Sequence, residues 1–253
     1  MTTESPKGKS IGIIMTWNCA TMVEGIWNRV PKEYFDEIIL VDDGSTDDTF
    51  AVAQKLGIKS FTHPHGGYGA NIKFGLQKAI ELGGDYMVEI HGDGQYDPSF
   101  IPRALEIMRE GKDFLLGSRF TDMMQPLRDK MSFARWGANI ALSFFDRIIL
   151  GVPLTEFHTG FRVYSRKLVE TVDFTGTSND FLFSFEIIAQ ARYCNLRIGE
   201  LAIRCDYSKE HSSISIKKSV VYAFQTFGTL CQYVCAQMGF PSKFFHCKNC
   251  EVL

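Results

Sequence analysis

The stretch 89–98 contains residue types that could hold a phosphate-bearing ligand. It reads Glu-Ile-His-Gly-Asp-Gly-Gln-Tyr-Asp-Pro and follows a segment in which Val88 and Ile90 alternate with polar neighbours, as in a strand. Asp93 and Gln95 stand in its glycine-spaced turn, and their oxygen atoms suit Mg²⁺ or Mn²⁺. A metal at the carboxyl end of a strand would neutralise a diphosphate. The alternative is an ordinary surface turn, because Gly, Asp and Pro also form turns.

A second acidic stretch follows the apolar run 38–41. It contains Asp42 and Asp43 and continues as Gly-Ser-Thr-Asp-Asp. Ser45 and Asp48 have the spacing of a capping box, which predicts that a helix begins here. Two adjacent carboxylates at one strand end exceed what a helix cap needs, which favours ligand binding.

These stretches resemble the family 2 glycosyltransferases. Val-Asp-Asp-Gly-Ser-Thr-Asp is similar to that family's nucleotide-binding strand end, and His-Gly-Asp-Gly-Gln resembles its Asp-Ala-Asp-Gly-Gln metal motif, typical of polyprenyl-phosphate sugar transferases. Gly-Ser-Arg-Phe at 117–120 and His-Thr-Gly-Phe-Arg-Val-Tyr-Ser at 158–165 extend the resemblance over roughly residues 10 to 215. The resemblance implies an α/β chain with the GT-A fold, a mainly parallel mixed sheet flanked by helices. It also implies a metal-dependent, inverting transfer of a sugar from a UDP- or GDP-sugar to a polyprenyl phosphate.

The donor side is expected in the first half of the chain. The resemblance assigns base or ribose contacts to Asp43 and Asp42, and nucleotide contacts to Thr16 and Asn18, although the Pro and Glu usual in the latter segment are absent. The glycine-rich loop 65–71, which includes Gly67, precedes a helix whose backbone N–H groups could face phosphate. A tight turn is the other interpretation of that loop, and the loop does not match a dinucleotide-binding fingerprint.

The metal site is expected at Asp93, supported by Gln95. His91 stands where the family pattern has an acid. Imidazole binds Mn²⁺ but suits Mg²⁺ poorly, so His91 is either a third ligand, a direct phosphate contact, or simply the end of the strand.

The acceptor side is expected in the second half. Arginine forks match phosphate geometry, and the resemblance gives Arg119, Arg162 and Arg204 such a role; exposed salt bridges are the alternative. An anionic phosphate acceptor needs no general base, whereas a hydroxyl acceptor does. The candidates for that base are Glu156, His158 and Asp180. His158 could equally contact metal or diphosphate, and Asp180 could cap a helix.

Bulk properties indicate a globular chain. It has 253 residues, a net charge of −2 and 45% hydrophobic residues, which gives no reason to expect a nucleic-acid partner. Seven cysteines without an export signal indicate free thiols in a reducing, cytoplasmic compartment. The ending His-Cys-Lys-Asn-Cys at 246–250 has metal-like spacing but lacks a second ligand pair, so a frayed tail is expected. The expected division is a disordered residue range 1–10, a GT-A domain at 11–215, and an amphipathic helix with a tail at 216–253.

Strands and helices alternate in the first half, which predicts right-handed crossovers and a mainly parallel sheet. The expected strands are 11–15, 35–41, 58–62, 86–90, 114–116, 161–164 and 197–203. The expected helices are 19–27, 46–56, 70–82, one after Pro98, 132–150 and 183–193.

Residues 219–242 contain no charged side chain. Val220, Phe224, Phe227, Cys231, Val234 and Met238 follow the spacing of one helical face, and five Gln or Thr residues make the segment a poor membrane span. The favoured interpretation is a helix packed on the domain or in a homo-oligomer. The alternative is a helix lying in the plane of a membrane surface, at its inner face, near a lipid acceptor.

Two other functions remain open at this stage. One is a family 2 enzyme that transfers the sugar to a saccharide hydroxyl in surface polysaccharide synthesis. The other is a nucleotide-sugar-binding protein with little turnover, because His91 departs from the metal motif.

Overall fold

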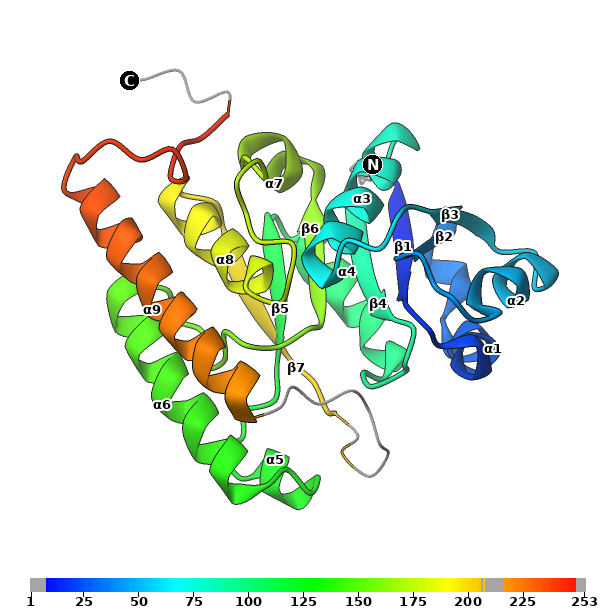
Figure 1. Cartoon of the computed structure of the whole chain (residues 1–253), viewed down its shortest axis with the longest axis horizontal. Coiled ribbons are helices and arrows are strands. Elements are labelled where there is room, and N and C mark those ends of the chain that lie inside the picture. Colours follow the sequence, from blue (N-terminus) through cyan, green and yellow to red (C-terminus); the bar gives the residue numbers. More distant parts are fainter. Residues whose placement is uncertain (1–7, 206, 208–215, 249–253) are drawn as a thin grey trace, which may run out of the picture.

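The computed structural model describes residues 8–205, 207 and 216–248. The expected disordered segment 1–10 falls mainly outside this range, but Ser10 is ordered as the first residue of a strand. The described chain forms an α/β structure around one mixed sheet, as predicted (Figure 1).

The sheet has seven strands in the order β3-β2-β1-β4-β6-β5-β7. Their bounds are Ser10–Thr16 for β1, Glu37–Asp42 for β2, Lys59–Thr62 for β3, Tyr86–His91 for β4, Phe114–Ser118 for β5, Arg162–Ser165 for β6 and Ile198–Ala202 for β7. Strands β1 to β4 pair in parallel, as do β5 and β7. Only β6 runs antiparallel to both of its neighbours in this sheet.

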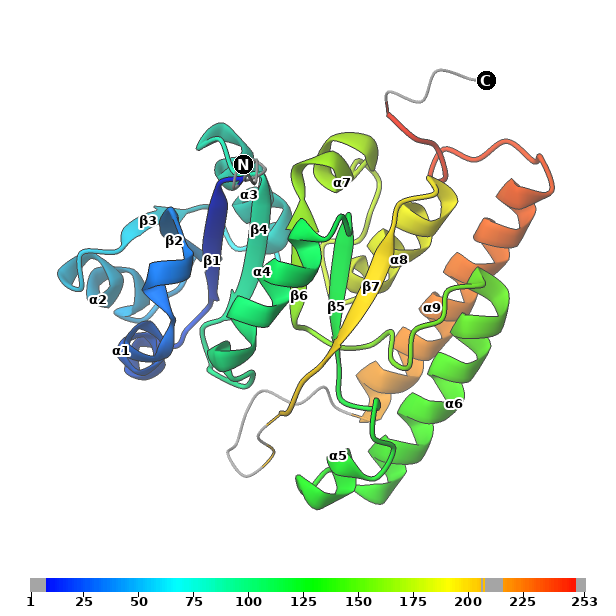
Figure 2. The ribbon, with the colours of Figure 1, turned by 180° about the vertical axis from the view of Figure 1, so that it is seen from behind.

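Helices cover both faces of the sheet, as Figures 1 and 2 show. The α-helices are α1 (Ala20–Arg29), α2 (Thr49–Lys55), α3 (Tyr68–Glu81), α4 (Ile101–Arg109), α5 (Gln125–Arg128), α6 (Phe133–Leu150), α7 (Arg166–Thr171), α8 (Phe183–Tyr193) and α9 (Ile216–Gln237), with 3-10 turns at Lys32–Tyr34 and Pro98–Phe100. Alternate side chains of the strands point to opposite faces. Thus Ile13 packs in the core beneath α3 and α8, whereas Ile14 packs in the core beneath α1, α2 and α4.

Local capping decides where several helices begin. Asp97 accepts a hydrogen bond from the Ser99 N–H at 3.0 Å, as its position before Pro98 predicts. Ser132 caps α6 through its hydroxyl oxygen. The predicted capping box between Ser45 and Asp48 is wrong, because the Ser45 hydroxyl is engaged with a strand-end carboxylate and α2 begins only after Asp48.

Helix α9 packs on the domain, as the favoured interpretation expected, but it turns the predicted apolar face outward. The homo-oligomer alternative for that face stays a prediction. Phe224 and Phe227 are 75% and 61% exposed. The face packed on the domain carries Thr226, Leu230 and Tyr233 instead. Within the described residues, no helix is long and apolar enough to span a bilayer.

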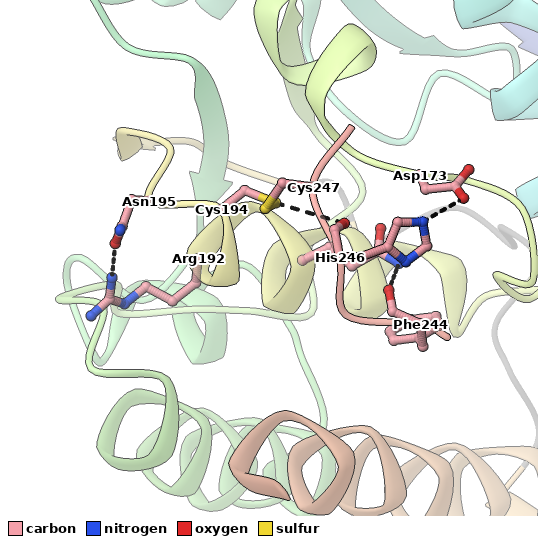
Figure 3. Close-up of a disulfide and its surroundings, with 8 residues drawn as sticks. Asp173, Arg192, Cys194, Asn195, Phe244, His246 and Cys247 are labelled. Carbon is pink, nitrogen blue, oxygen red and sulfur yellow. Dashed lines mark hydrogen bonds and ion pairs between the residues drawn. A yellow bond between two sulfur atoms is a disulfide. The ribbon is translucent and has the colours of Figure 1, made fainter. Parts of the chain in front are cut away.

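A disulfide joins Cys194, at the end of α8, to Cys247 (Figure 3). His246 next to it contacts Asp173 at 2.9 Å, and Phe245 is buried. The expectation of free thiols and a frayed tail is therefore wrong for these residues. Cys250, the other half of the metal-like spacing, lies outside the described residues.

Candidate active site

The site lies at the edge where β1, β2 and β4 end. Because the three strands are parallel and adjacent, their carboxyl ends meet at one edge, where open α/β sheets bind ligands. Thr16 stands opposite Asp42, and Met15 stands opposite His91. The two acidic stretches are thereby brought to neighbouring strand ends.

Asp42 is a buried carboxylate that joins the segments at this edge through hydrogen bonds. Its carboxylate accepts hydrogen bonds from the Ser45 N–H at 2.9 Å, the Ser45 hydroxyl at 2.5 Å, and the hydroxyls of Thr16 at 3.2 Å and Thr62 at 3.3 Å. Both Asp42 and Thr16 are buried. Their side chains therefore organise the strand ends, and the predicted ligand contacts of these two residues have no exposed group to use.

Asp43 holds the glycine-rich loop. Its carboxylate accepts the N–H groups of Gly66 at 2.7 Å and Gly67 at 3.0 Å, and contacts His65 Nδ1 at 2.8 Å. Gly67 has a φ of +99°, and a Cβ there would lie 2.6 Å from the Asn179 carbonyl oxygen. The loop thus requires glycine, because a side chain would collide with the segment before α8.

Asn18 and Trp17 shape the outer rim. Asn18 has a φ of 48°, an uncommon conformation that Asn tolerates better than most residues. It is held by Ser45 and by the Thr46 N–H, which donates to Asn18 Oδ1 at 2.9 Å. Trp17, 54% exposed, stacks on His65 with ring centroids 4.9 Å apart. Trp17 was not predicted as a site residue, although it directly follows β1, where ligand contacts are expected.

The turn after β4 presents the candidate metal ligands. Asp93 accepts the Gln95 N–H at 3.0 Å through Oδ1, and its second oxygen takes no hydrogen bond from the described residues. Gly92 donates its N–H to the Met15 carbonyl at 2.8 Å, and a Cβ there would lie 2.6 Å from that oxygen. The turn is therefore pressed against β1, which fixes the position of Asp93.

His91 is held by a buried carboxylate. Its Nε2 lies 3.1 Å from Glu89 Oε1 and 3.0 Å from the Gly160 carbonyl. Both partners are acceptors, so Nε2 carries the proton and cannot ligate a metal. The predicted metal contact could be made only through Nδ1 of the neutral ring, because both nitrogens of an imidazolium carry protons.

Glu89 was not predicted as a site residue. It accepts hydrogen bonds from the hydroxyls of Tyr68 at 2.7 Å and Tyr164 at 2.6 Å, in addition to His91. Burial by itself would raise the pKa of Glu89, but the hydrogen bond and charge of His91 outweigh it and the pKa is lowered. Glu89 therefore remains a carboxylate and fixes the end of β4.

Arg119 and Glu156 form an enclosed ion pair. Arg119 Nε donates to Glu156 Oε1 at 2.8 Å, a second nitrogen also contacts that carboxylate, and the Arg119 backbone N–H donates to Oε2 at 2.8 Å. A third nitrogen donates to the Tyr207 hydroxyl at 2.7 Å. Burial would lower the pKa of Arg119, but the charge of Glu156 raises it well above its ordinary value. Glu156 has no exposed surface, so its carboxylate cannot reach an acceptor hydroxyl.

His158 lies between two helices. Its Nδ1 is 3.0 Å from the Tyr222 hydroxyl of α9, and its Nε2 is 2.9 Å from Asp146 Oδ2 of α6. These two atoms are close but not aligned for a hydrogen bond, and neither has a hydrogen-bond partner among the residues that the structure describes. The predicted base therefore joins the acceptor-half loop to α6 and α9.

Arg162 is fully buried, which contradicts its expected contact with an acceptor phosphate. Its guanidinium donates to the carbonyls of Thr159 at 3.0 Å and Ser184, and lies over the Phe114 ring. Sequence spacing showed its motif but not the depth of β6, an interior strand that runs antiparallel to both of its neighbours.

Two predicted side chains remain accessible in the acceptor half. Asp180 is exposed and accepts the Phe181 N–H at 2.8 Å, just before α8, although it is not the N-cap residue of that helix. Arg204 is 66% exposed and pairs with Asp129, with Nε 3.2 Å from Oδ2.

Among the described residues, no three His, Cys, Asp or Glu side chains are close enough to form a metal cage. Asp93 and Gln95 still fit a cation held largely by its substrate, because Mg²⁺ is usually bound by one or two carboxylates together with substrate phosphates and water.

Comparison with known proteins places the chain. The family description "Glycosyl transferase family 2" matches residues 12–173. A UDP-N-acetylglucosamine–dolichyl-phosphate N-acetylglucosaminyltransferase of Methanococcus voltae is 26% identical over 85% of this chain and 92% of its own length. A polyprenol monophosphomannose synthase of Mycolicibacterium smegmatis is 27% identical over 75% of this chain and 74% of its own.

A solved structure supports the fold assignment. Glucosyl-3-phosphoglycerate synthase of Mycobacterium tuberculosis, solved with Mn²⁺, UDP and its product, superimposes with a TM-score of 0.65, at 16% identity, over 93% of this chain and 82% of that one. With the family match spanning more than half of its residues, the chain belongs to glycosyl transferase family 2 and has the GT-A fold.

Proposed function

We propose that this enzyme transfers a sugar from a nucleoside diphosphate sugar to a polyprenyl phosphate. Two relatives that match most of the chain are named for transfer to dolichyl phosphate or polyprenol. The transfer is proposed to be one in-line displacement with inversion, in which an acceptor phosphate oxygen attacks the sugar carbon and the nucleoside diphosphate leaves.

The choice of a phosphate over a hydroxyl acceptor rests on the burial of the candidate bases. Glu156 is enclosed with Arg119, and His158 is held by Tyr222 and Asp146. Only Asp180 among the three candidates is exposed. A phosphate acceptor is already anionic and needs no base, so this arrangement favours a phosphate over a saccharide hydroxyl.

The donor is proposed to lie along the ends of β1, β2 and β4. The exposed Trp17–His65 stack offers an apolar surface to a nucleotide base. Asp43 fixes the loop at Gly66 and Gly67, so that the start of α3 faces the diphosphate.

Asp93 and Gln95 would hold a divalent cation, Mg²⁺ or Mn²⁺. The cation would neutralise charge on the departing diphosphate. The protein's own contribution is positional, because Gly92 and the rigid end of β4 hold the Asp93 carboxylate at the strand end.

The acceptor phosphate is proposed to meet Arg204. Its guanidinium is 66% exposed and pairs with Asp129, a carboxylate that is only 9% exposed and also accepts the Gln125 side-chain N–H at 2.9 Å. A phosphate would therefore approach the exposed side of the guanidinium, and displacing Asp129 would leave that carboxylate with Gln125. A lipid acceptor also places the enzyme peripherally at a membrane surface. The Cys194–Cys247 disulfide removes the free-thiol argument for the cytoplasmic face of that membrane.

The test is turnover of purified protein with Mn²⁺, a panel of UDP- and GDP-sugars, and a short polyprenyl phosphate or a saccharide acceptor. The wild type is expected to transfer sugar to the lipid phosphate, and the Asp93→Ala variant is expected to give no such product. Asp97→Ser is the matched control, because Asp97 is the neighbouring carboxylate and Ser preserves its capping bond. Product on the saccharide instead would contradict the acceptor assignment, and full turnover by Asp93→Ala would contradict the metal site.

A further inference from the structure

Exposed apolar side chains are concentrated on one side of the molecule. Of the sixteen large hydrophobic side chains most exposed in the described part, thirteen lie in residues 123–148 and 220–240. Only Trp17, Met22 and Tyr34 lie elsewhere. Figures 1 and 2 show α6 and α9 side by side, on the side of the sheet away from β3.

Each of the two helices contributes one continuous outward face. On α6 it carries Phe133, Phe144, Phe145 and Ile148, which are 55–73% exposed; on α9 it carries Val220, Val221, Phe224, Phe227 and Val234, which are 41–75% exposed, and Met238 and Phe240 extend it. A patch of this size is unusual for a surface exposed to water and indicates an interaction site.

The charges on these segments are mostly positive, and the one acid among them is buried. Residues 133–150 and 216–243 contain five basic residues and one acid, Asp146. Asp146 is 1% exposed and faces His158. A two-fold contact with a second copy would bring like charges together, whereas anionic lipid headgroups complement them.

We propose that α6 and α9 together form a lipid-docking face that lies in the interface of an anionic bilayer. Their first turns lie at the same end of the molecule as the carboxyl ends of β1 and β4 (Figure 1). With both helices lying on the bilayer, the end of the sheet that carries the candidate active site opens alongside the membrane, and its acceptor half is the part next to the surface where a membrane-embedded acceptor presents its phosphate. This inference goes beyond the proposed reaction and can fail independently of it.

The test is flotation with vesicles of phosphatidylcholine alone or with phosphatidylglycerol, without any sugar acceptor. Binding is expected to be stronger with phosphatidylglycerol and to weaken between about 0.1 and 0.5 M salt. Phe224→Ser with Phe227→Ser, and separately Phe145→Ser with Ile148→Ser, should each lower the partition coefficient about tenfold or more. Met22→Ser with Tyr34→Ser is the matched control on another surface and should leave binding unchanged.

A second measurement uses thiols that the face already carries. Cys231 and Cys235 are exposed on α9, while Cys19 and Cys205 are buried. With Cys250→Ser, an environment-sensitive maleimide on these two thiols should shift its emission to the blue when vesicles are added.

Three outcomes would overturn the proposal. Vesicle binding that both helix variants retain would show that lipid docks elsewhere. Vesicle binding that is lost in the α9 variant but kept in the α6 variant would exclude α6 from the face. Wild-type protein that sediments as a dimer, ignores vesicles and becomes monomeric with the Ser variants would make a second copy the occupant.

Discussion

Replacing Glu156 by Gln is expected to destabilise the fold rather than remove a catalytic base. The substitution leaves the Arg119 guanidinium buried with a neutral partner, and it puts an amide where the carboxylate accepts the Arg119 backbone N–H at 2.8 Å. Breaking a buried ion pair from one side costs about 3–5 kcal/mol. That is a large fraction of a total stability of about 5–15 kcal/mol, and it corresponds to a fall in Tm of roughly 6–20 °C.

The assay is urea unfolding of the wild type, Glu156→Gln, and the double variant Glu156→Leu with Arg119→Met. Removing both charges should recover much of the loss, because a buried pair is often replaced by apolar side chains at little cost. A midpoint that is unchanged in Glu156→Gln, together with a fall in kcat of about 10²–10⁴-fold, is the signature of a general base. That pair of results would refute the structural role and reopen a hydroxyl acceptor.

Three further changes test other parts of the molecule. Arg204→Gln should raise the KM for polyprenyl phosphate and leave the KM for the donor unchanged in steady-state kinetics; an effect on the donor alone would move Arg204 to the other substrate. Cys194→Ser should lower the free energy of unfolding by about 2–4 kcal/mol, and reductant should lower the wild type to the same value in urea titrations, because the bridge closes a loop between residues 53 apart in sequence. Burial would raise the pKa of Asp173, but hydrogen bonds from Thr175 and Lys248 lower it. The contribution of Asp173 to the free energy of unfolding, about 1 kcal/mol, should therefore be present above pH 4 and lost as the pH falls below 4. Thermal melts of Asp173→Asn should not show that loss.

Local patterns in the sequence predicted the elements well. Helix α8 has the predicted bounds, and β1, β2 and β4 differ from the predicted strands by at most two residues at either end. These segments are buried, so hydrophobic periodicity reports their packing directly. The capping box failed because Asp42 accepts both the N–H and the hydroxyl of Ser45, while Asp47 accepts the Thr49 N–H at the start of α2. Spacing alone does not show which of these carboxylates takes each donor.

Side-chain depth could not be read from the sequence. Arg162 and Glu156 carry charges that normally lie at the surface, yet both are fully buried because each finds its partners in distant segments. The disulfide is a similar case, since Cys194 and Cys247 meet only after α9 folds back along α8. The apolar face of an amphipathic helix usually packs inward. On α9 it faces outward, because Tyr222 and Thr226 face inward to the polar group around His158.

His158 lies between the proposed lipid-docking face and the candidate active site. Its ring touches α6 through Asp146 and α9 through Tyr222, while its backbone carbonyl accepts from Arg119 at 3.4 Å. Two residues further on, the Gly160 carbonyl accepts a hydrogen bond from His91 Nε2, beside the turn that carries Asp93. Buried side chains without spare room transmit displacement rather than absorb it. Movement of α6 and α9 on docking would therefore displace the loop 156–160 first. The polar cluster around His158 would in this way position the acceptor half of the site relative to the membrane surface that presents the acceptor.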